Sequence, residues 1–288
     1  MNARLVLGTV QFGAEYGIAN KSGQVEKDEV FRILKYAHDQ GIKKLDTAYA
    51  YGESQNLIEE FIAREKVSFD LISKVKADQG PIRDAVETSL QTLQQEPMYG
   101  LLVHSYEDFN SQPALWNDLR NLKEEGKVKN IGFSLYSPDE LDDLFDKKID
   151  FDMVQFPYNL FDRRFESRFQ KLKEHAVEIH ARSVFLQGLV FLDPNTLAGK
   201  PRGAESHLKK LNSIAHNSGL SLSAICLNFV FKNEHIDHIV IGVDSLSQLK
   251  TNVDNLRHAE AVASMENELR SLSIDDEKIL MPHKWELV

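Results

Sequence analysis

Short apolar runs alternate along the chain with segments in which apolar residues recur every three or four positions. A short apolar run is typical of a buried strand, and the 3.6-residue period is typical of an amphipathic helix. One clear helical stripe contains Val30, Ile33, Leu34 and Ala37, on a helix that ends near Gly41. The pattern predicts eight strands, each followed by a helical stretch, at Arg4–Gln11, Ile42–Thr47, Phe69–Val75, Tyr99–His104, Val128–Ser134, Met153–Phe156, Glu178–Phe185 and His238–Gly242.

Several helix starts carry recognisable signals. Gly80-Pro81 opens the helix after the third strand, where a proline is tolerated in the first turn. The segments 137–140 (SPDE) and 245–248 (SLSQ) have a serine at the cap and Glu or Gln three residues later. This is the spacing of a capping box, and both segments follow predicted strands directly.

Eight strand–helix units in 288 residues take about 36 residues each, which suits a (β/α)8 barrel. A doubly wound sheet is the competing arrangement. No two glycines lie two residues apart, so the G-x-G turn that binds a dinucleotide in doubly wound folds is absent. No linker rich in Pro, Gly or Ser divides the chain. We therefore predict an α/β fold, a TIM barrel in which residues 1–288 form a single domain.

Charge and cysteine content narrow the choice of partners. The chain has 34 Lys and Arg against 44 Asp and Glu, a net charge of −10, which repels nucleic acid and anionic membranes. No apolar run approaches the ~20 residues of a membrane helix, and no secretion signal follows Met1. The single cysteine, Cys226, can form no internal disulfide. We expect a cytoplasmic protein that binds neither nucleic acid nor membrane.

Polar residues interrupt the apolar pattern at the ends of three consecutive strands. Asp46 ends the second predicted strand, Lys74 lies near the end of the third, and His104 ends the fourth. Tyr51 follows Asp46 by five residues, in a loop. Taken singly, each is typical of a solvated rim residue or a local hydrogen bond. Neighbouring strand ends meet at the C-terminal face of a barrel, so we expect these side chains to converge there.

These residues carry a resemblance to a known family. Residues 45–52 (LDTAYAYG), with Ser73-Lys74 and Val103-His104 at later strand ends, resemble the aldo-keto reductases. The resemblance extends from residues 7–13 to residues 242–252. It implies a (β/α)8 barrel, NADP(H) or NAD(H) bound without a Gly-rich turn, and a small-molecule carbonyl substrate that is reduced to an alcohol. Only three residues precede Arg4, so the hairpin that closes the barrel bottom in many relatives is not expected.

The resemblance also implies a role for each polar residue at the strand ends. Tyr51 is the general acid that protonates the carbonyl oxygen, and we expect the Lys74 ammonium to lower its pKa. Asp46 pairs with Lys74 and keeps it charged. His104, as a neutral donor, orients the carbonyl and helps to polarise it.

The nicotinamide end of the cofactor maps onto the fifth to seventh strands. The resemblance implies that Ser134 and Gln155 hold the carboxamide, although Leu135 replaces the Asn that follows the serine in the family. Arg182 stands where relatives often have a stacking aromatic residue. We expect its guanidinium to lie against the nicotinamide ring or reach the pyrophosphate; a rim salt bridge is the alternative.

The adenosine end maps onto the last strand and the helix that follows it. Its predicted contacts are Gly242, Ser245, Gln248 and Asn252, because a capped helix N-terminus binds phosphate. The Lys and Arg that commonly grip a 2′-phosphate have no counterparts here, and Asp244 adds a like charge. Use of NADH therefore stays open beside the family's usual NADPH.

Two other functions are alternatives for such a barrel. A metal-dependent barrel hydrolase is disfavoured because the first strand carries no His-x-His, and His235 and His238 lie near the start of the last strand, so we expect no metal site. A cofactor-binding barrel that acts as a redox sensor or partner subunit with little turnover is the second. The sequence determines neither the physiological substrate, nor the direction of the reaction, nor the oligomeric state.

A few aromatic residues are candidates for the substrate pocket. Phe12, Tyr16 and Tyr49 either line it or pack in the core. Trp285 either folds over the site or packs on the barrel.

Overall fold

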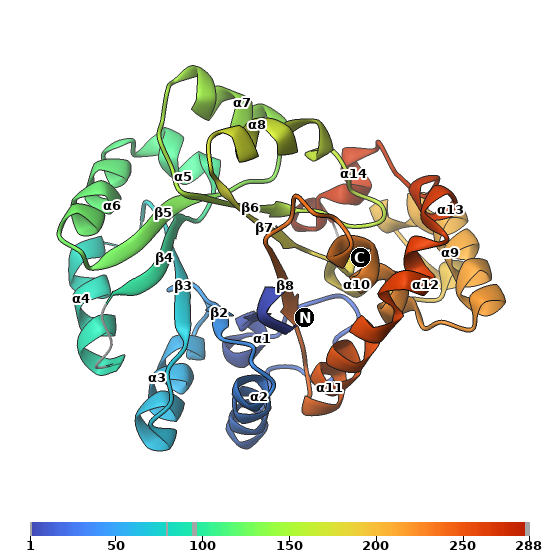
Figure 1. The fold of residues 1–288 in the computed structure, drawn as a ribbon, viewed down its shortest axis with the longest axis horizontal. Helices are drawn as coiled ribbons and strands as arrows, with labels where there is room; N and C mark the ends of the chain where they lie inside the picture. Colours follow the sequence, from blue (N-terminus) through green and yellow to red (C-terminus); the bar gives the residue numbers. More distant parts are fainter. Residues whose placement is uncertain (1, 79, 94–96, 286–288) are drawn as a thin grey trace.

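Eight parallel strands form a closed barrel in a computed structural model that describes residues 2–78, 80–93 and 97–285. Each strand pairs with its sequence neighbours, and β8 returns to pair with β1. Helices surround the strands (Figure 1), so the (β/α)8 barrel is confirmed and the doubly wound sheet is excluded. The strands are β1 Leu5–Gly8, β2 Lys44–Asp46, β3 Asp70–Val75, β4 Met98–Val103, β5 Val128–Ser134, β6 Met153–Pro157, β7 Glu178–Arg182 and β8 His238–Gly242.

The connecting segments are mostly helical. The α-helices are α1 Val10–Gly13, α2 Lys27–Asp39, α3 Ser54–Glu65, α4 Ile82–Leu93, α5 Tyr106–Ser111, α6 Ala114–Glu124, α7 Pro138–Asp146, α8 Phe169–Glu174, α9 Glu205–Ser218, α10 Leu222–Phe231, α11 Leu246–Asn255, α12 Ala259–Ala263, α13 Glu266–Arg270 and α14 Glu277–Leu280. Short 3-10 helices are η1 Asn2–Arg4, η2 Glu166–Arg168, η3 Leu186–Phe191, η4 Pro194–Thr196, η5 Lys200–Ala204, η6 Leu256–His258 and η7 Pro282–Lys284. The capping box predicted at 137–140 is present at the start of α7.

Apolar side chains form two separate clusters. The larger one fills the space between the strands and the helices, and includes the predicted α2 stripe of Val30, Ile33, Leu34 and Ala37. The smaller one consists of Val6, Ile72, Leu102 and Met153. Because alternate residues of a strand point to opposite faces, these four side chains point into the barrel. This interior cluster makes the barrel a packed core and separates its two ends.

Polar side chains close the N-terminal end of the barrel. Tyr99 packs against the interior cluster, and its hydroxyl donates to Glu178 Oε2 at 2.7 Å. The Lys44 ammonium lies 4.1 Å from the centroid of the Tyr99 ring. His180 and His238 pair in register on β7 and β8 beside them.

Four predicted strands are shorter in the structure: β1, β2 and β7 by at least three residues each, and β3 by one. β1 ends at Gly8, and Gln11 belongs to the helical turn α1. The turn follows Thr9, whose amide and hydroxyl both donate to the Asp46 carbonyl at 3.0 Å. β7 ends at Arg182 because Ser183 has a φ of 59°, which is incompatible with an extended strand.

Among the described residues no single helix is long and apolar enough to cross a membrane. Two adjacent helical segments, Pro201–Ser218 and Leu222–Phe231, together have the length and apolar composition of a membrane span, and this is the only respect in which they resemble one. The two segments are bent by 97° relative to each other.

Gly13 sits directly against the loop that carries Tyr51, since a Cβ at this position would lie 1.7 Å from the Tyr51 carbonyl oxygen. We expect Gly13→Ala to lower the free energy of unfolding by about 1–3 kcal/mol, because the loop must shift to admit the methyl group. Urea unfolding measures this. The control is Gly8→Ala, whose Cβ would meet Val240 Cγ1 at 3.2 Å and is expected to cost less. Equal losses of unfolding free energy in the two variants would contradict close packing of the Tyr51 loop against Gly13.

Candidate active site

A buried ion pair between Asp46 and Lys74 lies at the C-terminal ends of β2 and β3. The Lys74 ammonium donates to both Asp46 carboxylate oxygens at 2.7 Å and to the Thr47 carbonyl at 3.1 Å. The two side chains are 6% and 2% exposed, so both charges are largely removed from water. Burial lowers the pKa of Lys74, and the Asp46 carboxylate opposes that shift. The Gln155 amide of β6 donates to Asp46 Oδ1 at 2.7 Å, which joins another strand to the pair.

Tyr51 and His104 lie beside this ion pair. Lys74 Nζ is 5.3 Å from the centroid of the Tyr51 ring. The Tyr51 and His104 rings meet edge to face, with centroids 6.1 Å apart. His104 follows β4 directly, and its amide donates to the Val75 carbonyl at 2.9 Å, which holds it next to β3. The structure thus brings together the four polar residues that the sequence placed at neighbouring strand ends.

The pKa of Tyr51 lies well above the ordinary phenol value. Burial is the main cause, Asp46 raises the pKa further, and Arg182 opposes both. The expectation of a lowered Tyr51 pKa was wrong, because burial and the Asp46 carboxylate outweigh the opposing charge of Arg182. Tyr51 therefore keeps its proton at neutral pH.

His104 is neutral at pH 7. Burial and the nearby Lys74 ammonium lower its pKa to about 4. Its Nδ1 atom is buried and has no hydrogen-bond partner among the described residues. A neutral imidazole carries one N–H donor and one acceptor nitrogen, so the ring has polar capacity left for a bound molecule.

A cavity of about 530 Å³ opens beside Asp46 and Tyr51. Most of the residues predicted to hold the cofactor line it, namely Gln155, Arg182, Gly242, Ser245, Gln248 and Asn252. Ser134 does not line it; this residue is 3% exposed at the end of β5 and pairs in register with Gln155. Of the remaining candidates, Tyr16 lines the cavity, whereas Phe12 and Tyr49 pack with the larger core. Trp285 also packs in that core and donates to the Lys278 carbonyl at 3.0 Å.

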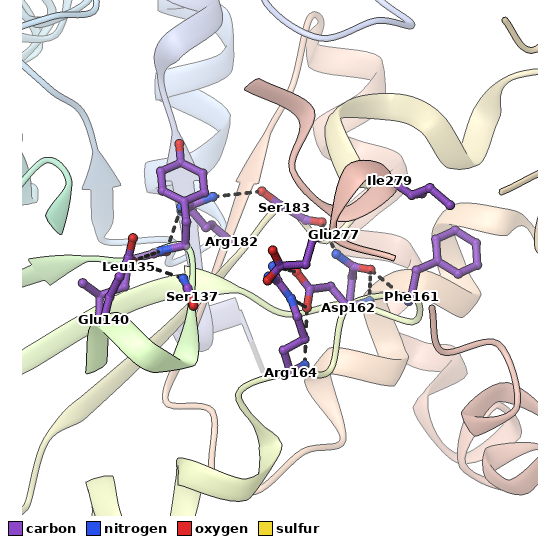
Figure 2. A network of polar contacts seen from close by, with 12 residues as sticks. Leu135, Ser137, Glu140, Phe161, Asp162, Arg164, Arg182, Ser183, Glu277 and Ile279 are labelled. Atoms are coloured by element: carbon purple, nitrogen blue, oxygen red, sulfur yellow. Dashed lines mark hydrogen bonds and ion pairs between the residues drawn. The ribbon is translucent and has the colours of Figure 1, made fainter. Parts of the chain in front are cut away.

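Arg182 reaches across the rim of the cavity, and its contacts are visible in Figure 2. Its guanidinium donates to the Leu135 carbonyl at 3.0 Å and to Ser183 Oγ at 3.4 Å. Its central carbon lies 4.2 Å from the centroid of the Tyr136 ring. Leu135, which departs from the family pattern, therefore contributes through its backbone. The alternative expectation for Arg182 was a salt bridge at the rim. The observed contacts are instead a hydrogen bond to a backbone carbonyl and a stack on an aromatic ring.

The N-terminus of α11 borders the cavity near β8. Ser245 caps the helix as predicted, since its hydroxyl accepts from the Gln248 amide at 3.3 Å. The Gln248 side chain does not complete the predicted box at Ser245; its Oε1 accepts from the Asp244 amide at 2.8 Å. Glu29 of α2 accepts from the Leu246 amide at 2.7 Å. Two carboxylates therefore stand at this helix end, which weakens its attraction for a further anion.

Some residues that line the cavity were not identified from the sequence, among them Gln11, Ser247 and Thr251. Gln11 Oε1 is buried and has no hydrogen-bond partner among the described residues. A Cβ on Gly242 would lie 2.5 Å from Gln11 Nε2, so the glycine leaves room for this side chain. The only sequence signal was the position of Gln11 at the end of the first predicted strand.

The ion pair generates a stability prediction. Asp46→Asn leaves the Lys74 ammonium buried without its counter-charge, and we expect a loss of about 3 kcal/mol of unfolding free energy at pH 7. Adding Lys74→Met removes the uncompensated charge, so the double variant should recover most of that loss. Urea unfolding of both variants measures the difference. A double variant no more stable than Asp46→Asn would show that the charge itself is not the cause.

Comparison with known proteins identifies the family and agrees with the fold. A profile described as "Aldo/keto reductase family" matches residues 4–274. The chain is 26% identical to the uncharacterized oxidoreductase YqkF of Bacillus subtilis (strain 168), over 90% of this chain and 91% of that protein. It is 24% identical to L-galactose dehydrogenase of Arabidopsis thaliana, over 96% and 90%. The fold matches aldo-keto reductase AKR11C1 from Bacillus halodurans in its holo form, with a TM-score of 0.74, 20% identity and coverage of 98% and 95%. Because the profile spans most of its length, the chain belongs to the aldo/keto reductase family.

Proposed function

We propose that this family member is an NAD(P)H-dependent oxidoreductase that reduces an aldehyde or ketone to an alcohol, with Tyr51 as the general acid. The observation that carries the proposal is the buried Asp46–Lys74 pair beside a protonated Tyr51 and a neutral His104, next to a cavity of about 530 Å³ that Asp46 and Tyr51 line. A reduced nicotinamide supplies the hydride when bound. The residues of the chain position the reactants and supply the proton.

Tyr51 delivers the proton to the carbonyl oxygen. Hydride addition at the carbonyl carbon leaves an alkoxide, which is a stronger base than a phenolate. A Tyr51 with a raised pKa is fully protonated at neutral pH and still transfers its proton downhill to this oxygen. The O–H bond of Tyr51 breaks as the alcohol O–H bond forms. The resulting phenolate is then reprotonated from solvent, which closes the cycle.

His104 and the ion pair act on the substrate and on Tyr51. The neutral His104 ring donates a hydrogen bond to the carbonyl oxygen, which fixes its orientation and stabilises the negative charge that develops there. Lys74 stabilises the transient Tyr51 phenolate, since its ammonium lies 5.3 Å from the ring centroid. Asp46 keeps Lys74 charged in a buried position. Arg182 is a second cation that favours the phenolate.

The cofactor fits the donors along the cavity. Gln155 donates its amide to Asp46, which leaves its carbonyl oxygen for the carboxamide of a nicotinamide. Ser134 would assist from the neighbouring strand. Arg182 supplies positive charge for the pyrophosphate. The unpartnered Gln11 Oε1 offers a further acceptor in the cavity wall.

The adenosine end would rest on Gly242, Ser245, Gln248 and Asn252, all of which line the cavity. NAD(H) and NADP(H) have the same nicotinamide end, so the residues proposed to hold that end suit either cofactor. Asp244 and Glu29 disfavour a 2′-phosphate at α11, so we expect this chain to accept NADH.

The substrate class follows from the relatives. Among them are an L-galactose dehydrogenase and an L-glyceraldehyde 3-phosphate reductase of Escherichia coli, 24% identical over 84% of this chain. We therefore place sugar-derived aldehydes, with and without phosphate, first in an assay panel.

Replacing the proposed acid tests the mechanism. We expect Tyr51→Phe to lower kcat by at least about 100-fold, because the proton donor is lost, while the Kd of NADH or NADPH changes little. Nicotinamide absorbance measures turnover and fluorescence measures binding. Tyr49→Phe, two residues earlier and outside the cavity lining, is the matched control.

Two results would contradict the proposal. Unchanged turnover in Tyr51→Phe would exclude Tyr51 as the acid. A wild-type protein that binds the cofactor but reduces no carbonyl compound in the panel would support the alternative, a sensor or partner subunit.

Asp244 tests the cofactor preference. We expect Asp244→Asn to lower the Km for NADPH several-fold and to leave the Km for NADH nearly unchanged, because only the 2′-phosphate gains from removal of the negative charge. Initial rates with both cofactors measure the two constants. Parallel changes in both would show that Asp244 does not face the 2′ position.

A further inference from the structure

A second group of polar side chains lies at the opposite end of the barrel from the cavity. Glu178, His180 and Arg182 alternate along β7, so their side chains share one face of the strand. Arg182 reaches the cavity, whereas Glu178 and His180 lie at the N-terminal end, where His238 of β8 pairs in register with His180. The interior cluster of Val6, Ile72, Leu102 and Met153 occupies the middle of the barrel.

The two histidines meet one carboxylate oxygen. Glu178 Oε1 lies 2.5 Å from His180 Nε2 and 3.5 Å from His238 Nε2. The two imidazole rings are 4.7 Å apart between centroids. A set of one potential ligand atom from each of the three residues lies within 4.8 Å. The His180 side chain has no exposed surface, whereas Glu178 and His238 are 25% and 14% exposed, which gives solvent a route to the group.

Although the sequence led us to expect no metal site, we propose that Glu178, His180 and His238 bind a divalent transition-metal ion of the zinc class, with a water molecule as the fourth ligand. Two imidazoles and a carboxylate form a donor set that zinc accepts. Tetrahedral ligands at about 2.1 Å from zinc stand about 3.4 Å apart. The Glu178–His238 separation of 3.5 Å already fits, and His180 must withdraw from Glu178 by less than about 1 Å.

A hydrogen bond orients the carboxylate of this group, whereas the outer nitrogens of the two histidines have no such support in the part of the chain that the structure describes. The Nδ1 atoms of His180 and His238 are both buried, and neither has a hydrogen-bond partner among the described residues. Tyr99 holds Glu178 by its other oxygen, since the phenol donates to Oε2 at 2.7 Å. Such a contact orients a metal-binding carboxylate while Oε1 stays directed at the histidines.

The surrounding charges do not forbid a cation. The Lys44 ammonium acts electrostatically on His238, and it pairs with Asp70 at 3.6 Å. Asp237 adds a carboxylate near His238 and is itself paired with Lys173. With these two pairs compensated, Glu178 leaves one net negative charge among the proposed ligands.

The ion would stabilise the barrel and would take no part in the reaction. The interior cluster lies between the site and the cavity, so the metal has no contact with the reacting groups. In the ladder, β7 pairs in register with β8 only at His180–His238 and Ala181–Ile239, while β6 and β7 pair along their whole length. A metal that joins Glu178 and His180 to His238 would stabilise this short pairing between β7 and β8.

The test uses the full chain without an affinity tag, dialysed against EDTA and then against metal-free buffer. We expect Co²⁺ to bind with 1:1 stoichiometry and to give the intense absorption between about 500 and 700 nm that marks tetrahedral coordination. Zn²⁺ should displace it in a calorimetric titration. Zn²⁺ should also raise the Tm.

Substitutions locate the ion. His238→Gln and Glu178→Gln replace partly exposed ligands, so these variants test the site without opening the buried His180 position. Each is expected to weaken Zn²⁺ binding by at least about 100-fold and to abolish the Tm shift. His235→Gln, three residues before His238 and exposed, is the matched control and should bind as wild type.

The outcomes are decisive in either direction. Absence of saturable binding of Co²⁺ or Zn²⁺ to folded wild-type protein would overturn the proposal. So would binding that persists unchanged in folded His238→Gln and Glu178→Gln, since the metal would then lie elsewhere. Circular dichroism confirms folding of each variant. None of these measurements uses turnover, so their outcome is independent of the proposed reductase activity.

Discussion

The buried pair of Asp46 and Lys74 is the constraint on which the C-terminal end of the barrel depends. Two charges that are 6% and 2% exposed persist only because the carboxylate receives two bonds from the ammonium and another from Gln155. These contacts link β2, β3 and β6. Burial keeps the proton on Tyr51 and keeps His104 neutral; Asp46 adds to the first effect and Lys74 to the second.

The interior of the barrel has three layers with different physical roles. The polar end at the cavity and the polar end at the N-terminal side are separated by the interior cluster of Val6, Ile72, Leu102 and Met153. β7 contributes to both ends, because Glu178, His180 and Arg182 point to the same face at successive pleats. This apolar layer keeps the two polar groups out of contact with each other.

The cofactor end shows how neighbouring elements modify a local motif. Ser245 caps α11 as the spacing indicated, but Gln248 turns to Asp244 and Glu29 of α2 takes the Leu246 amide. A helix N-terminus that looks free along the chain is therefore partly occupied by a carboxylate from a distant helix. Arg182 likewise uses the Leu135 carbonyl, a contact that no side-chain pattern specifies.

The sequence by itself determined the barrel, because eight apolar runs separated by helical stripes report burial locally, and it placed Asp46, Lys74 and His104 at neighbouring strand ends. It also predicted the caps of α7 and α11, which depend on residues three apart. Only the tertiary structure decided where β1 and β7 end, the direction of the Tyr51 pKa, and the meeting of Glu178, His180 and His238. Strand ends, pKa values and side-chain clusters depend on burial and on residues distant in sequence, which periodicity along the chain does not encode.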